Sequence, residues 1–144
     1  MLFSITLFSV FLVDALVKFF IARNPSFIFA IIPNFLEIIS VRNDGMLFGF
    51  FSNTNDIMAV VSLLIATCLF IFLYIKKDIS SLSRLAYGLI LVGAISNIVD
   101  RIFYGAVIDY IYIPIINFPV FNISDIAICT GAGLLVLDLF KKKK

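Results

Sequence analysis

The chain has 144 residues, of which 62% are hydrophobic and 14% are charged, with a net charge of +2 and a mean hydropathy of +1.16. Soluble domains carry about 25% charged residues, so this composition excludes an ordinary soluble protein and indicates an integral membrane protein of one domain, residues 1–144. Histidine is absent, which excludes Ser-His and Cys-His nucleophile systems, histidine-based zinc sites and histidine proton relays.

Four apolar runs predict membrane-spanning helices, because about 20 residues of helix cross the hydrocarbon. They lie at about residues 2–22, 57–75, 85–103 and 122–140. The first run is interrupted by Asp14 and Lys18, which are four residues apart and therefore share one helix face. Either these two form an internal ion pair that fixes helix packing, or one of them borders a functional site.

The segment from Arg23 to Asn55 is mixed in character. It contains β-branched and aromatic stretches, two prolines and the turn signal Asn43-Asp44-Gly45. We expect two short strands that end in a tight turn. Such a segment is too polar to cross a membrane and too apolar to be free in water, so we predict that it lies on the surface beside the bilayer.

The last turns of the third predicted helix carry a polar group. Asn97, Asp100 and Arg101 are spaced three and four residues apart, so they can meet on a common side of the helix. Residues 104–121 follow and contain one glycine and two prolines. This segment is predicted to be a short outer loop that carries Asp109.

The positive charges predict the orientation. Seven of the eleven Lys and Arg residues lie at 76–84 and 141–144, which is one side of a four-helix arrangement. The positive-inside rule makes that side cytoplasmic, so both termini are expected inside, and the connections 23–56 and 104–121 are expected outside. The lysines at 141–144 also suit an anchor to anionic lipid.

Two acidic residues, Asp109 and Asp125, fall at the outer ends of neighbouring predicted helices. Taken singly, Asp125 suits a helix cap and Asp109 a solvated loop. Both are flanked by apolar and aromatic residues, and two carboxylates held close in such surroundings share a proton, because like charge and poor solvation raise the pKa of one member. One can then activate a water while the other polarises a carbonyl. A rival mechanism would use Lys18 as the base for a serine nucleophile, but the sequence offers no obvious serine at the depth of the outer leaflet.

Five blocks follow one another along the chain: Asp14 with Lys18, Arg42-Asn43-Asp44-Gly45 followed by Phe48-Gly49, residues 93–101 (GAISNIVDR), residues 105–110 (GAVIDY) and residues 121–125 (FNISD). Together they resemble, over nearly the whole length, the lipoprotein signal peptidases, also called signal peptidase II, which are bacterial membrane aspartic peptidases. The chain departs from that pattern at Ser96, where glycine is usual, and at Leu47 and Ser124, where alanine is common. The first departure suggests a looser helix contact, and the other two suggest an altered substrate pocket.

The resemblance implies that Asp109 and Asp125 are the catalytic dyad of an endopeptidase. The implied reaction is removal of the signal peptide from diacylglyceryl-modified prolipoproteins, with the cut just before the lipidated cysteine. The resemblance also implies a set of residues that bind substrate or brace the site: Asp14, Lys18, Asn43, Gly45, Asn97, Asp100, Arg101 and Asn122. Asn43 and Asn122 would offer amide hydrogen bonds, and Arg101 would contact substrate carbonyls or lipid phosphate.

The resulting prediction is an all-α membrane protein with four transmembrane helices, a small extracytoplasmic β-rich cradle and a short outer loop. We expect a monomer among phospholipids of the bacterial inner membrane, with its active site at the outer face, no metal, no organic cofactor and no nucleic-acid partner. Residues 25–49 would form a cradle or lid over the substrate, with Phe48, Phe50 and Phe51 dipping into lipid.

Two other classes of function remain open at this point. A transport or channel subunit would use Asp14, Lys18, Asp100 and Arg101 as a buried charge path, and would not need Asp109 or Asp125. A structural membrane partner would use its polar residues only to hold helices together, and would have no activity to lose.

Overall fold

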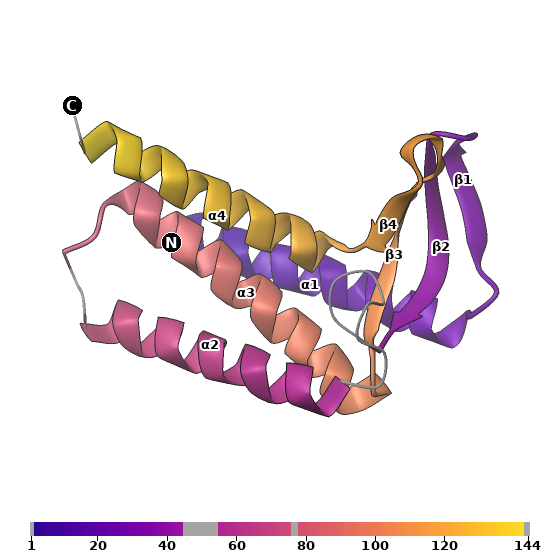
Figure 1. Ribbon diagram of the computed structural model, residues 1–144, viewed down its shortest axis with the longest axis horizontal. Coiled ribbons are helices and arrows are strands. Elements are labelled where there is room, and N and C mark those ends of the chain that lie inside the picture. The colour runs from indigo at the N-terminus through magenta and orange to yellow at the C-terminus, as the bar shows by residue number, and fades with distance from the viewer. Residues whose placement is uncertain (1, 45–54, 76–77, 143–144) are drawn as a thin grey trace.

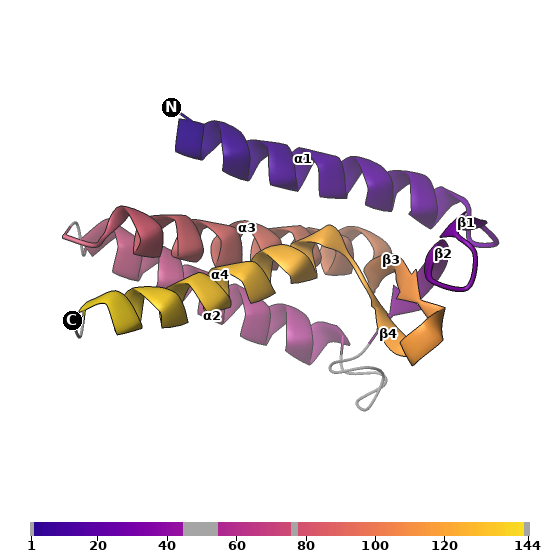
Figure 2. The same ribbon diagram turned by 90° about the horizontal axis from the view of Figure 1, so that it is seen from above.

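The computed structural model describes residues 2–44, 55–75 and 78–142. Within these ranges the chain forms, in order, α1 (Leu2–Arg23), β1 (Ile28–Ile32), β2 (Leu36–Asn43), α2 (Asn55–Ile75), α3 (Ser81–Tyr104), β3 (Val107–Ile113), a 3-10 turn (Pro114–Ile116), β4 (Phe118–Phe121) and α4 (Ile123–Lys142). The helices form a bundle and the sheet covers one end of it (Figures 1 and 2). The start of α1, the end of α2, the start of α3 and the end of α4 lie at the opposite end.

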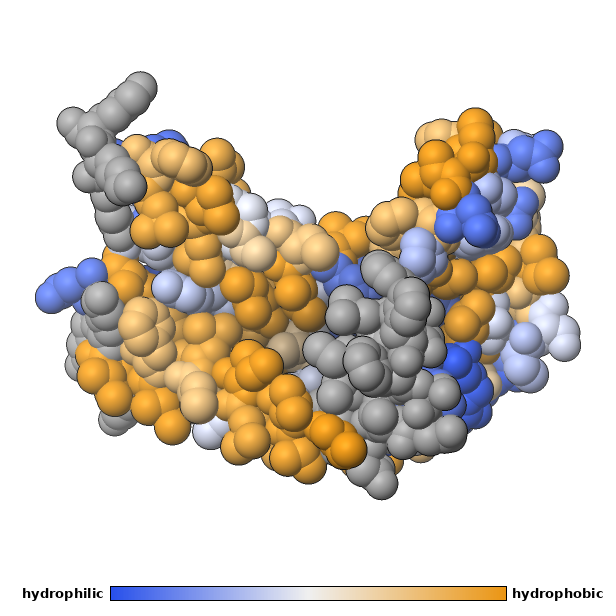
Figure 3. Space-filling view, viewed as in Figure 1, coloured by the Kyte–Doolittle hydropathy of each residue, from blue (hydrophilic) through white to orange (hydrophobic). Residues whose placement is uncertain are grey.

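Each of the four predicted helices is present, and no end differs from the prediction by more than four residues. Among the described residues, α1, α3 and α4 are long and apolar enough to cross a membrane, whereas the apolar stretch found in α2, Val60–Leu73, is shorter. Large hydrophobic side chains on the outer faces of these helices are exposed, and they dominate the surface of the bundle (Figure 3). Such a surface suits contact with lipid rather than water.

The four strands form one antiparallel sheet in the order β1-β2-β3-β4. The two strands predicted before residue 44 are confirmed as β1 and β2. They are joined by a turn in which Asn34 has φ 59°, a left-handed conformation that asparagine tolerates better than most residues. The tight turn predicted at Asn43-Asp44-Gly45 lies partly outside the described residues.

The prediction of a loop over residues 104–121 is wrong, because this segment forms β3 and β4. Residues 107–113 are mostly β-branched or aromatic, which suits a pleated strand. They pair with β2, a strand distant in sequence, so that Val41 lies opposite Asp109 and Asn43 opposite Val107. Asp109 is therefore held on a strand in the middle of the sheet.

Close packing of α3 against α4 depends on two glycines. A Cβ atom at Gly93 would lie 2.5 Å from the Ser124 carbonyl oxygen, and one at Gly131 would lie 2.5 Å from the Ala86 carbonyl oxygen. Small residues at such positions let two helix backbones approach, which is a common way to associate helices in lipid. The approach brings the beginning of α4 against the middle of α3.

A second contact joins α3 and α4 at the end away from the sheet. The buried Asp138 carboxylate of α4 accepts hydrogen bonds from the hydroxyls of Ser80, at 2.9 Å, and Ser83, at 2.7 Å. Ser80 is also the N-cap of α3 and accepts a hydrogen bond from the Ser83 backbone N–H at 3.0 Å. A carboxylate is favourable at this helix N-terminus because it complements the helix dipole.

Candidate active site

The first turn of α4 holds Asp125 by a reciprocal cap. The side-chain oxygen of Asn122 accepts a hydrogen bond from the Asp125 backbone N–H at 2.9 Å, and the Asp125 Oδ2 atom accepts one from the Asn122 backbone N–H at 3.2 Å. This is the geometry of a capping box, which fixes a side chain at the third helical position. The second carboxylate oxygen, Oδ1, accepts a hydrogen bond from Asn97 Nδ2 at 2.9 Å.

Asp109, on β3, is only 2% exposed. Its Oδ1 atom accepts a hydrogen bond from Asn122 Nδ2 at 2.7 Å, and its Oδ2 atom accepts one from Asn43 Nδ2 at 2.9 Å. Burial raises the pKa of the Asp109 carboxyl to about 7, and the neighbouring Asp125 carboxyl raises it in the same direction, while the two amide donors oppose the change. The folded site therefore favours the protonated form of Asp109 much more than water does.

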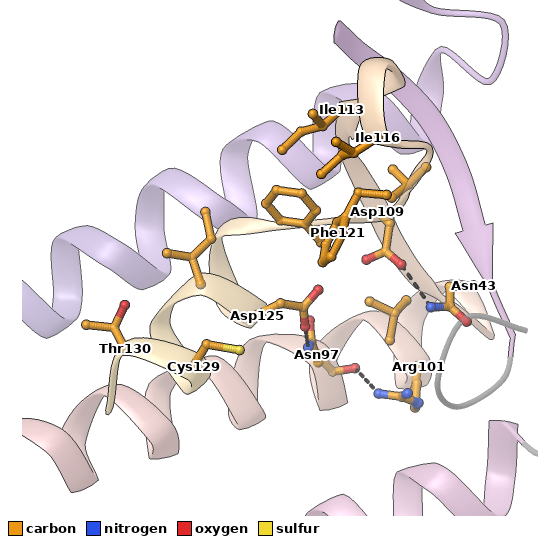
Figure 4. Close-up of a pocket in the computed structure, with 14 residues that line it drawn as sticks. Asn43, Asn97, Arg101, Asp109, Ile113, Ile116, Phe121, Asp125, Cys129 and Thr130 are labelled. Atoms are coloured by element: carbon orange, nitrogen blue, oxygen red, sulfur yellow. Dashed lines mark hydrogen bonds between the residues drawn. The ribbon is translucent and has the colours of Figure 1, made fainter. Parts of the chain in front are cut away.

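Asn122 links the two acids, since its backbone N–H binds Asp125 and its side-chain amide binds Asp109. Figure 4 shows both carboxylates directed into the same cavity. The juxtaposition of Asp109 and Asp125 that the sequence analysis expected is thus present, although the two residues come from a strand and a helix rather than from a loop and a helix.

The cavity has a volume of about 680 Å³ and lies between the helices and the sheet, where the molecular surface is hollowed (Figures 3 and 4). Its lining has a polar part and a larger apolar part. The polar part consists of Asn43, Asn97, Arg101, Asp109, Asp125 and Thr130. The apolar part consists of Val107, Ile113, Ile116, Phe118, Val120, Phe121, Ile126 and Cys129. A mostly apolar cavity with a few convergent polar groups is typical of a site that binds an organic ligand.

Arg101 contributes a cation to the polar part of the cavity (Figure 4). Its Nη1 atom donates to the Asn97 carbonyl oxygen at 3.3 Å. Its Nε atom is buried and has no hydrogen-bond partner among the residues that the structure describes. A guanidinium with an unused donor beside a cavity can bind a carbonyl or phosphate oxygen of a ligand.

Behind the cavity lies a buried ion cluster centred on Lys18. The Lys18 Nζ atom is 2.9 Å from Asp14 Oδ2 and 2.8 Å from Asp100 Oδ2, and the lysine side chain is 1% exposed. It also donates to Asn97 Oδ1 at 2.8 Å. The internal ion pair expected within the first helix is therefore present. It also borders the candidate site, because Asn97 in turn binds Asp125.

The other two members of the cluster fix the sheet to the helices. Asp100 Oδ2 accepts a hydrogen bond from the Ile108 backbone N–H at 3.1 Å, which ties the end of α3 to β3. Asp14 accepts hydrogen bonds from Ser96, Tyr110 and Ser124. No pattern in the sequence predicted that these three hydroxyls bind Asp14, although Ser96 and Ser124 are departures from the family pattern.

The predicted site residues therefore fall into two groups. Those at the cavity or bonded to its two acids are Asn43, Asn97, Arg101, Asp109, Asn122 and Asp125. Asp14, Lys18 and Asp100 are buried behind this group and do not line the cavity. Gly45, Leu47, Phe48, Phe50 and Phe51, to which the sequence analysis also gave roles, lie outside the described residues.

Comparison with known proteins identifies the family. Residues 6–141 match the model of the family described as Signal peptidase (SPase) II. The chain belongs to the signal peptidase II family. This membership confirms the resemblance on which the sequence analysis relied, and it makes the chain a member of a family of membrane peptidases.

Individual relatives of this signal peptidase II sequence align over most of their length. It is 36% identical over 142 residues to the lipoprotein signal peptidase of Pasteurella multocida, an alignment that covers 92% of this chain and 85% of the relative. It is 37% identical over 142 residues to that of Haemophilus influenzae, with 93% and 82% covered. A solved bacterial membrane enzyme superimposes with a TM-score of 0.89 at 29% identity, over 99% of this chain and 89% of the other.

Proposed function

We propose that this chain is an aspartic endopeptidase that removes signal peptides from bacterial prolipoproteins, with Asp109 and Asp125 as its catalytic pair. The observation that carries this proposal is the double hydrogen bond of Asn122, which binds one carboxylate through its backbone and the other through its side chain at the wall of one cavity. Family membership and the names of the relatives support the choice of substrate.

In the proposed reaction the two acids share one proton. The ionised carboxylate removes a proton from a water molecule, and the water oxygen forms a bond to the carbon of the scissile carbonyl. The protonated partner donates a hydrogen bond to the carbonyl oxygen, and a proton then passes to the amide nitrogen as the C–N bond breaks. The pKa of about 7 for Asp109 suits this exchange, because a group that titrates near the working pH both gives and accepts protons readily.

The cavity supports the proposed substrate. Its apolar lining, which includes Ile113, Ile116 and Phe118, can take acyl chains or the apolar end of a signal peptide. The guanidinium of Arg101, which lines the same cavity, can bind a substrate carbonyl or a phosphate oxygen. In this proposal the diacylglyceryl group of the modified cysteine occupies the apolar part, and the bond just before that cysteine lies beside the two acids.

The proposed membrane arrangement places the sheet and the cavity at the outer face of the bacterial inner membrane. Arg84 and Lys141 lie at the other end of the bundle, where positive charge is typical of the cytoplasmic side. In this arrangement α2 is the fourth spanning helix and both termini are cytoplasmic. One chain supplies both acids and their amide donors, which supports a monomer acting as a single unit over residues 1–144.

The test uses purified protein in detergent and a diacylated prolipoprotein peptide. Asp109→Asn and Asp125→Asn should each lower the cleavage rate by at least about 10³-fold, because each removes a group that transfers a proton. Asp138→Asn is the matched control, since it neutralises another buried carboxylate that lies away from the cavity. Cleavage by a folded Asp109→Asn or Asp125→Asn variant at close to the wild-type rate would refute the catalytic assignment.

A further inference from the structure

The Asp14 carboxylate is fully buried in α1 and is bound by hydroxyl groups from three other elements. Its Oδ1 atom accepts a hydrogen bond from Tyr110 Oη of β3 at 2.8 Å. Its Oδ2 atom accepts hydrogen bonds from Ser96 Oγ of α3 at 2.7 Å and from Ser124 Oγ of α4 at 2.5 Å. A single side chain therefore holds a strand and two helices together at one point.

Two of these donors are direct neighbours in sequence of the proposed catalytic acids. Tyr110 follows Asp109, and Ser124 precedes Asp125. We propose that Asp14, Tyr110 and Ser124 form a clamp that sets the spacing and orientation of the two acids, so that Tyr110 and Ser124 are positioning residues of the reaction. This inference rests on the proposed function, because it concerns the same pair of carboxylates.

The geometry of a strand explains how Tyr110 can act on Asp109. Successive side chains of a strand point to opposite faces of the sheet. Asp109 faces the cavity while Tyr110 is buried on the other side, in contact with the α1 helix, and is 2% exposed. The tyrosine oxygen also accepts a hydrogen bond from the Ile123 backbone N–H at 3.3 Å, so it joins β3 directly to the first turn of α4.

The clamp is expected to be stiff because its acceptor is ionised and shielded from water. Asp14 Oδ2 lies 2.9 Å from the Lys18 ammonium, and hydrogen bonds to an ionised group are shorter and about twice as strong as neutral ones. Catalysis is sensitive to such support, since a displacement of about 1 Å in a reacting group can cost about 10²-fold in rate. Loss of one clamp hydroxyl should therefore affect the chemical step more than substrate binding.

The test compares Ser124→Ala, Tyr110→Phe and Ser83→Ala in the prolipoprotein-peptide assay, together with thermal unfolding and size-exclusion chromatography. Ser83 is the matched control, because its hydroxyl also binds a buried carboxylate, at 2.7 Å, but at the far end of the bundle. We expect Ser124→Ala and Tyr110→Phe each to lower kcat about tenfold with KM changed less than about twofold. Ser83→Ala should leave kcat unchanged, and Ser124→Thr, which keeps the hydroxyl, should recover most of the lost rate.

Each outcome decides the proposal. Folded Ser124→Ala and Tyr110→Phe variants with wild-type kcat would overturn the clamp, and so would an equal loss of kcat in Ser83→Ala. If one clamp variant does not fold, the other carries the same test. Failure of the proposed function looks different, because either the wild type would not cleave the peptide at all or Asp109→Asn would cleave it as well as wild type. An inactive Asp109→Asn beside a fully active Ser124→Ala would overturn the clamp alone.

Discussion

Asp109→Asn should change the stability of the protein in a pH-dependent way, whatever it does to activity. In the folded protein burial raises the pKa of this carboxyl from 3.8 to about 7. Between these two values the folded state holds a proton that the unfolded state has lost. Stability is therefore greatest at acid pH and decreases as the pH rises towards 7, because the folded protein binds the extra proton.

The size of the effect follows from the same pKa. Stability changes by about 1.4 kcal/mol for each pH unit in this window. From pH 5 to the folded pKa of about 7 the wild type should lose about 3 kcal/mol through Asp109, and no more from this group at higher pH. Asparagine has no charge to bury, so the variant escapes this loss. The variant instead loses about 1 kcal/mol of stability at every pH, because one of the two amide donors that bind Asp109 then faces the NH₂ group of the new asparagine, which cannot accept a hydrogen bond.

The assay is thermal unfolding of wild type and Asp109→Asn in detergent at pH 5 and pH 8. The Tm of the variant minus the Tm of wild type should be about 6 to 12 °C larger at pH 8 than at pH 5. This range converts the loss of about 3 kcal/mol at about 2 to 4 °C per kcal/mol for a chain of this size. Asp78→Asn serves as the control, since Asp78 is exposed and lies three residues before the start of α3. A Tm difference that is the same at both pH values would refute a burial-raised pKa at Asp109.

Three further predictions concern activity and packing. The wild-type kcat/KM should fall as the pH rises above about 7, where Asp109 loses its proton, and a flat profile from pH 6 to 9 would contradict the shared proton. Lys18→Met should destabilise the protein by about 3 to 5 kcal/mol, because two buried carboxylates lose their cation; an unchanged Tm would contradict this. Gly131→Ala should cost about 1 to 3 kcal/mol, since its Cβ would meet a backbone oxygen at 2.5 Å. Gly133→Ala has open space and should change stability by no more than about 1 kcal/mol in thermal unfolding.

The helices could be predicted from the sequence because the length of an apolar run is a local property set by bilayer thickness. The two later strands could not, because a strand is defined by its partner. Residues 107–113 pair with β2, more than sixty positions earlier, and Pro114 and Pro119 suggested a loop instead. In the structure Pro114 begins a 3-10 turn and Pro119 lies on β4, an edge strand where proline is tolerated.

The candidate site shows the same division between local and distant information. Asp109 and Asp125 could be picked out from the sequence as acids in apolar surroundings, and Asn122 from the resemblance to the family. The contacts of Asp14 involve side chains up to 110 positions away, and no local pattern reveals them. Ser124 was expected to alter the substrate pocket, but it lies outside the cavity lining and binds Asp14 instead.

The clamp also bears on how the chain is made. The α1 helix is synthesised before α3, β3 and α4. It carries an acidic and a basic side chain that each cost about 2.5 to 3.5 kcal/mol at the bilayer centre. Asp14 and Lys18 bind each other, but their other partners lie 78 to 110 positions later in the chain. The α1 helix therefore gains its full set of contacts only after α4 has been synthesised.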